Sequence, residues 1–84
     1  MKYTVEYYNT VLNVWDGYDE FCDIIADSAE MAIELAIDWC VEHDENRSID
    51  SVDDLYCKYN DWWWRAAEIT TENGITDRGE WVVK

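Results

Sequence analysis

Positive charge is what this chain lacks most. No Lys or Arg occurs between Tyr3 and Asn46, whereas the same stretch holds twelve Asp and Glu residues. Over all 84 residues, six basic side chains face twenty acidic ones, for a formal net charge of −14. Because Lys and Arg contacts to phosphate supply most non-specific affinity for nucleic acids, we expect no direct binding of DNA or RNA. Anionic lipid headgroups would repel such a surface as well.

Several other absences limit the class of protein. The chain has no proline, only three glycines, no internal repeat and no apolar stretch near the roughly 18–20 residues of a membrane span. The N-terminus has no basic region followed by an apolar run, so we expect no secretory signal. The three cysteines show no paired spacing, which predicts free thiols in a reducing compartment. We therefore expect a soluble cytoplasmic protein with one domain over residues 1–84.

Motifs of known catalytic sites are also missing. The chain has a single histidine, no glycine-rich phosphate loop, no nucleophile elbow and no zinc-hydrolase motif, so we expect neither an enzyme nor a cofactor. Cys40 and His43, with Cys22 and Cys57, have the residue types of a tetrahedral metal site. However, Cys40 and His43 lie on the predicted core face of a helix. We interpret them as a buried thiol and a core histidine, and expect no metal.

Enough apolar residues are present for a folded domain. Hydrophobic residues make up 49% of the chain, and thirteen are aromatic, six of them Trp, so this is not an acidic disordered segment. Alternation predicts a half-buried strand over Lys2–Tyr8. Asp16-Gly17 is typical of a hairpin turn, and Tyr18–Ala26 then follows as a second strand. Further strands are expected over Asp61–Thr70 and Gly79–Val83, with a turn at Thr71–Gly74 between them.

The clearest predicted element is a helix from Ala29 to about His43, capped by Asp27 or Ser28. Its expected core face holds Ala29, Ala32, Ile33, Ala36, Trp39, Cys40 and His43. The polar connector over Asp44–Asp54 ends with a short helical turn starting near Ser51. The predicted fold class is α+β: a small antiparallel sheet of about four strands in β-β-α-β-β order, with one main helix packed on one face.

An acidic stripe on this helix is the first candidate site. Glu30, Glu34, Asp38 and Glu42 lie together at i, i+4 spacing, although such like-charge pairs destabilise a helix by a few tenths of a kcal/mol each. Ordinary solvated faces mix Glu with Lys or Arg, and this face has neither. We predict that it binds a basic partner, with a plain solvated face as the alternative. The other acidic candidates for partner binding are Asp19, Glu20, Asp23, Asp53 and Asp54.

Charge spacing limits imitation of nucleic acid by this stripe. Steps of four residues place the carboxylates about 6 Å apart along the helix, whereas duplex DNA presents one charge per roughly 1.7 Å of axis. One stripe is thus too sparse by about a factor of three. Mimicry needs a second row, for which Asp16–Asp23 and Asp44–Asp54 are the candidates.

The second candidate site is aromatic. Successive side chains of a strand point to opposite faces, so the run Trp62-Trp63-Trp64 cannot lie wholly in one core. We expect Trp63 to face solvent or a partner, beside Arg65, since Trp and Arg are common among interface hot spots. The alternative is that a loop covers this second face of the sheet.

The size, charge, missing targeting signal and compact α+β pattern resemble the small acidic proteins that phages and mobile elements use against bacterial defence. These include anti-CRISPR proteins and DNA mimics that block restriction enzymes. The resemblance rests on composition across the whole chain and assigns no residue. It implies an inhibitor that binds the basic nucleic-acid-binding surface of a nuclease complex in the bacterial cytoplasm. Two alternatives stay open: a non-enzymatic homodimeric interaction module that pairs through an edge strand or the Trp-rich face, and a metal-binding regulator.

Overall fold

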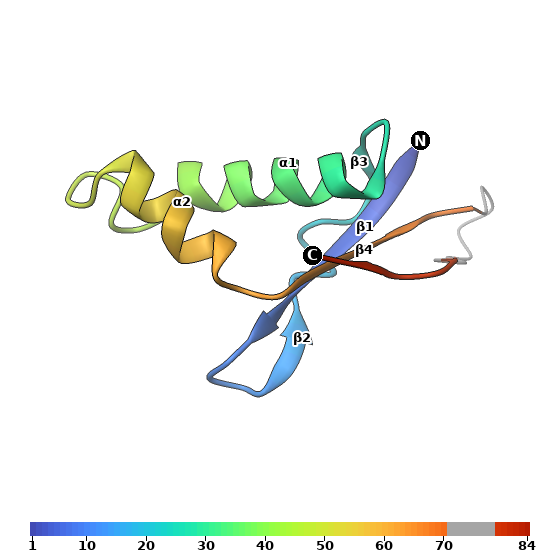
Figure 1. Ribbon diagram of the computed structural model, residues 1–84, viewed down its shortest axis with the longest axis horizontal. Coiled ribbons are helices and arrows are strands. Elements are labelled where there is room, and N and C mark those ends of the chain that lie inside the picture. The colour runs from blue at the N-terminus through green and yellow to red at the C-terminus, as the bar shows by residue number, and fades with distance from the viewer. Residues whose placement is uncertain (71–78) are drawn as a thin grey trace.

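A small antiparallel sheet with helices packed on one side forms the fold (Figure 1). The computed structural model describes residues 1–70 and 79–84. The elements within these residues are β1 (Lys2–Asn9), β2 (Val14–Asp16), β3 (Ile24–Ile25), α1 (Ala29–Glu42), α2 (Val52–Asn60), β4 (Trp64–Glu68) and β5 (Val82–Val83). The predicted α+β class, with a main helix against the sheet, is confirmed.

Strand β1 is the centre of the sheet. The strand order is β2-β1-β4-β5, and β3 pairs with β1 on the same side as β2, nearer the start of β1. In the β1–β4 ladder, Val5 lies opposite Ala66 and Tyr7 opposite Trp64. Val5, Ala66 and Trp64 are fully buried under the helices. The predicted first strand is confirmed, and its Val5 face places the main core against α1, but Thr4 on the opposite face is fully buried as well, so burial does not alternate as expected.

The hairpin that follows β1 is not where the sequence predicted it. Residues 10–13 connect β1 to β2, and Asp16-Gly17 comes only after β2. The Asn9 side chain accepts hydrogen bonds from the backbone N–H groups of residues 11 and 12 at 3.0 and 3.1 Å. Asn13 takes a positive φ of 57°. Asparagine is common in turns because its side chain bonds nearby backbone N–H groups and because it tolerates positive φ. This turn therefore forms without glycine.

The predicted strand over Tyr18–Ala26 is wrong for most of its length, because only Ile24–Ile25 pairs as β3. The chain turns at Gly17, whose carbonyl accepts from the N–H of Phe21 at 2.9 Å. Gly17 has φ +94°, and a Cβ there would lie 2.7 Å from the Tyr7 ring. This turn lets Phe21 enter the core. Burial of one aromatic ring thus replaces the strand pairing that local propensity favours.

Helix α1 begins where predicted but is rotated about its axis. Ser28 caps it by accepting from the N–H of Met31 at 3.2 Å. Trp39 and His43, predicted in the core, are both exposed and stack on each other at 4.2 Å. Aliphatic side chains fill the helix–sheet interface without polar atoms, whereas indole and imidazole nitrogens need polar partners. The buried residues of α1 are Ala32, Ile33, Ala36, Ile37, Cys40 and Val41.

Helix α2 is longer than the single turn that the sequence predicted. The Ser51 hydroxyl accepts from the N–H of Asp54 at 3.2 Å and so caps the helix. Leu55 and Tyr59 are buried, and α2 packs beside α1 on the same side of the sheet (Figure 1). Neither helix in the described part of the chain has the length and apolar character to cross a membrane.

Candidate partner-binding surface

The acidic stripe of α1 is exposed along its whole length. Glu30, Glu34, Asp38 and Glu42 are all exposed, and among residues 1–70 and 79–84 none of them pairs with a basic side chain. The rotation of α1 moves this stripe toward the β5 side of the helix. Met31 and Leu35, each 42% exposed, lie next to the stripe and form part of the helix surface that faces away from the sheet. The stripe therefore borders the sheet instead of pointing straight away from it.

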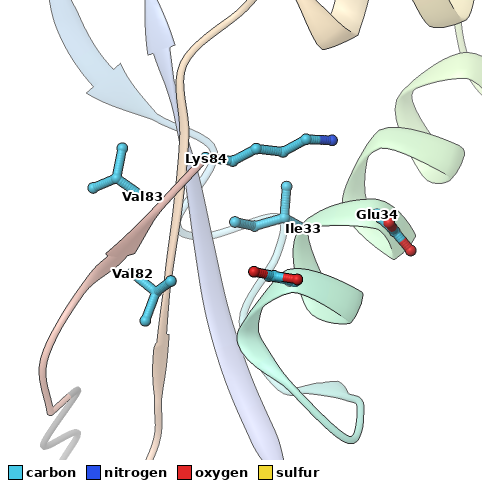
Figure 2. A pocket seen from close by; sticks show the side chains of 6 residues that line it. Ile33, Glu34, Val82, Val83 and Lys84 are labelled. Carbon is cyan, nitrogen blue, oxygen red and sulfur yellow. The ribbon is translucent and has the colours of Figure 1, made fainter.

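A groove lies between α1 and β5 (Figure 2). Its volume is about 270 Å³, and Glu30 and Glu34 from α1 line one side. Val82 and Val83 of β5 form the other side and are 45% and 65% exposed, with the Val83 side chain pointing away from α1 (Figure 2). The buried Ile33 also lines it, between the two walls. The groove thus combines an apolar lining with carboxylates along one wall.

The stripe continues into a second hollow toward α2. This hollow is lined by Glu34 and Asp38 of α1 and by Tyr56 and Asn60 of α2. The Tyr56 hydroxyl donates to Asp38 Oδ1 at 2.8 Å. Lys84 lines both hollows, and its Nζ donates to Asn60 Oδ1 at 3.0 Å. Lys84 therefore bonds a neutral amide and leaves Glu30 and Glu34 without a counter-ion among the described residues.

The other predicted acidic residues do not join this stripe. Asp19, Glu20 and Asp23 lie on the connection from β2 to β3, at the sheet edge opposite β5. Asp53 and Asp54 lie in the first turn of α2, where an anion stabilises the helix dipole. The structure thus distributes the predicted acids over three places.

Asp44 is not available as part of a second row of charges. Its side chain is only 4% exposed, and it accepts hydrogen bonds from the Tyr59 hydroxyl and from Lys58 Nζ, the latter at 3.1 Å. The hydrogen bond from Tyr59 lowers the pKa of Asp44, and further bonds from the Asn46 backbone N–H and from Lys58 act in the same direction. This carboxylate joins the end of α1 to α2 and is structural.

The second face of the sheet carries the exposed tryptophan. Trp63 is 64% exposed, as expected, whereas Trp64 is buried and Trp62 packs against the core. The strand expected over Asp61–Thr70 is shorter, because β4 begins only at Trp64, and Ala67, expected beside Trp63, is buried. The Trp63 ring lies 5.5 Å from that of Tyr8, and the Tyr8 N–H donates to the Trp63 carbonyl at 2.8 Å. This face has no helix on it (Figure 1).

Arg65 lies on this second face and is partly buried between aromatic side chains. Its guanidinium carbon is 4.3 Å from the centre of the Trp15 ring and 4.4 Å from that of Trp81. Its Nε donates to Glu6 Oε2 at 3.0 Å, and its Nη2 reaches the same oxygen at 2.5 Å. The sequence did not predict that Glu6, Trp15 and Trp81 lie beside Arg65, because these residues are far apart in the chain and only the folded sheet brings them together.

No metal site forms in the part of the chain that the structure describes, since no group of three His, Cys, Asp or Glu side chains is close enough to hold an ion. Cys22 and Cys57 are exposed and Cys40 is buried, all as free thiols. His43, predicted as a core residue, lies on the surface with its Nδ1 2.9 Å from the Trp39 carbonyl oxygen.

Comparison of this chain with protein-family models, curated proteins and solved structures finds no match. Its function is therefore inferred from its own surface. Two features of that surface bear on binding: the acidic stripe with the adjoining α1–β5 groove, and the Tyr8–Trp63 pair on the second face of the sheet.

Proposed function

We propose that this protein is an acidic inhibitor that binds the basic nucleic-acid-binding surface of a bacterial defence nuclease complex, as anti-CRISPR proteins do. The observation that supports this most is the stripe of Glu30, Glu34, Asp38 and Glu42. Four exposed carboxylates line one helix with no basic partner in the described residues. A net charge of −14 is well beyond the magnitude of about 2–8 that suffices for solubility.

The mechanism follows from general electrostatics. A basic groove that normally holds nucleic acid attracts the acidic stripe over a distance of about one Debye length, roughly 8–10 Å at physiological salt. Steering of this kind raises the association rate. Exposed aromatic residues such as Trp63 add the desolvated packing that slows dissociation. Nucleic acid and inhibitor then compete for one surface.

A homodimeric interaction module remains the alternative, because Trp63 and the open edge of β5 are also suitable for self-association. Two copies of a −14 chain repel each other, which disfavours that arrangement at low salt. Elution volume from a sizing column at low and high salt distinguishes a monomer from a dimer.

The direct test is a plaque assay. Bacterial strains that each carry one CRISPR or restriction system would express the protein and be challenged with a targeted phage. We expect plaque formation to be restored in at least one strain, and the purified effector of that system to lose duplex binding at a one-to-one ratio. Normal interference in every strain, with the protein expressed and folded, would contradict the proposal.

Charge reversal then tests the stripe itself. Asp38 is left intact because it bonds Tyr56, so the test variant is Glu34→Lys with Glu42→Lys. The control, Asp50→Lys with Asp61→Lys, makes the same change of net charge at exposed positions outside α1. We expect the test variant to associate with the effector at least about tenfold more slowly, as loss of electrostatic steering predicts. Equal effects of the two variants would mean that only overall charge matters.

A further inference from the structure

We propose that the α1–β5 groove binds an extended segment of the partner, which adds to the sheet as a strand on β5 and alternates basic with apolar side chains. The inference rests on the proposed function and specifies how the partner is held. The open edge of β5 contributes one part of the specificity, and the carboxylate and apolar side chains of the groove contribute the other.

The backbone of β5 provides the first part. β5 is the last strand in the order β2-β1-β4-β5, so its outer edge is unpaired within the described sheet. The Lys84 N–H donates to the Trp64 carbonyl at 2.9 Å, and Val82 lies opposite Ala66. In an antiparallel ladder the backbone groups of alternate residues point the same way, so the N–H and C=O of Val83 point outward. An added strand pairs with such groups.

The side chains of the groove provide the second part. On the helix side of the sheet, an added strand would place every second side chain against the exposed Val82, within reach of Glu30 and Glu34 (Figure 2). Lys and Arg fit there, because their aliphatic stems cover apolar surface while the charged group meets a carboxylate. On the other side, the intervening side chains lie beside the exposed Val83, which favours apolar residues.

Charge decides between a foreign partner and a second copy of this chain. A second copy would bring another −14 to a groove whose wall is already acidic. A second copy also has no basic strand to offer from the span between Tyr3 and Asn46, because β2, β3 and all of β1 except Lys2 lack Lys and Arg. A basic segment of another protein gains from the same carboxylates that repel a second copy.

The test uses synthetic peptides with the purified protein. The probe is the acetylated and amidated peptide KVKTKVK, and the control is KKKKVVT, which has the same composition and charge without alternation. Binding is followed by chemical-shift changes of backbone amides. We expect the alternating peptide to bind at least about tenfold more tightly and to shift Val82, Val83 and Lys84 together with the first turns of α1.

Variants locate the contacts. Glu30→Gln with Glu34→Gln should weaken binding of the alternating peptide by about fivefold or more, whereas Asp50→Asn with Asp61→Asn, an equal loss of charge elsewhere, should change it by less than about twofold. Val83→Pro removes the outward N–H and should abolish the preference for alternation. Val83→Thr keeps that N–H and should retain the preference for the alternating peptide. It therefore controls for the loss of the valine side chain.

Several results would overturn the inference. Equal affinity for the two peptides, or shifts centred on β2 or the Tyr8–Trp63 pair, would mean that the groove is not the site. Shifts of β5 amides that depend on protein concentration without peptide would identify a second copy as its occupant. If the groove variants leave phage protection intact while Glu34→Lys with Glu42→Lys removes it, the groove inference fails and the proposed function stands. If the peptide binds as expected but no defence system is inhibited, the groove inference stands and the proposed function fails.

Discussion

Arg65 shows how a single residue organises the sheet face that no helix covers. It is 27% exposed, lies between the Trp15 and Trp81 rings and pairs with Glu6, so it joins strands β1 and β4 to the aromatic residues on either side. Each cation–π contact of this kind contributes about 0.5–2 kcal/mol. Its position argues that Arg65 stabilises the fold more than it binds a partner.

The first prediction concerns this residue. Arg65→Ala should lower the free energy of unfolding by about 2–4 kcal/mol, because it removes both ring contacts and leaves the largely covered Glu6 carboxylate unpaired. Urea denaturation followed by tryptophan fluorescence measures the change. The matched control is Arg47→Ala, at an exposed residue that only bonds the Glu42 carbonyl, and we expect less than about 0.5 kcal/mol there. Similar losses in both variants would argue against the stacked arrangement.

Asp44 gives a prediction with a defined pH dependence. Its folded-state pKa is lowered, so it stabilises the protein above its unfolded pKa of about 3.9, and this contribution is lost as the pH falls through the folded value. At pH 7 Asp44→Asn should cost about 1–3 kcal/mol. The difference from the wild type should shrink below pH 4. Because protonation of the other acids affects both proteins alike, the difference isolates Asp44. A constant difference from pH 7 to pH 3 would contradict the prediction.

The three thiols should differ in reactivity. Burial raises the pKa of Cys40 to about 12, and the nearby Glu20 and Asp44 carboxylates act in the same direction. Cys22 and Cys57 are exposed. A colorimetric thiol reagent at pH 8 should modify two cysteines quickly, and the third only after denaturation. Rapid modification of all three would mean that Cys40 is accessible, and fewer than three thiols in denaturant would reveal a disulfide or a bound metal.

At the scale of elements, the rotation of α1 decides which of its side chains are structural. Ile37 is 2% exposed, whereas Leu35, an aliphatic residue of the same size on the same helix, is 42% exposed. The same rotation brings Glu30 and Glu34 to the α1–β5 groove. It leaves Trp39 at the surface, where its ring packs against the buried Phe21 with ring centres 5.3 Å apart.

This pair of residues gives a matched prediction. Ile37→Ala should destabilise the protein by about 2–4 kcal/mol through a lost core contact and a cavity. Leu35→Ala should cost less than about 1 kcal/mol. Chemical denaturation of the two variants under one set of conditions measures both values. If Leu35→Ala were the more costly change, the helix would have to be turned toward the orientation that its periodicity predicted.

At the scale of the whole molecule, repulsion among the acidic side chains should lower the thermal stability of the fold. In the described residues only Glu6 and Asp44 form ion pairs with Lys or Arg. The remaining carboxylates repel one another, and added salt screens this repulsion. We therefore expect Tm to rise between 20 mM and 500 mM NaCl. Sucrose at equal osmolality controls for solute effects. A Tm that is unchanged or lower in salt would show that repulsion is negligible.

The net charge also predicts that the protein does not bind nucleic acid. In a mobility-shift assay, micromolar protein should leave labelled duplex and single-stranded DNA unbound at physiological salt.

Local pattern was enough to predict several features of this protein. The alternation of Lys2–Tyr8 predicted the first strand, the Asp27-Ser28 pair marked the start of α1, and the three consecutive tryptophans required that at least one, expected to be Trp63, be exposed. These predictions succeed because a strand or helix places near neighbours in sequence at fixed relative positions. The net charge also follows from composition alone. The predicted turn at Thr71–Gly74 lies outside the described residues.

Tertiary structure decided what depends on residues far apart in the chain. The rotation of α1 depends on which side chains fit against β1 and β4, and periodicity alone favoured Trp39 where Ile37 is buried. Arg65 and Glu6 are 59 residues apart in the sequence, and they pair only because β1 and β4 lie side by side in the sheet. The α1–β5 groove and the separation of the acids into three places depend on strand order. Contacts of this range are set by packing of the whole chain, so local sequence does not encode them.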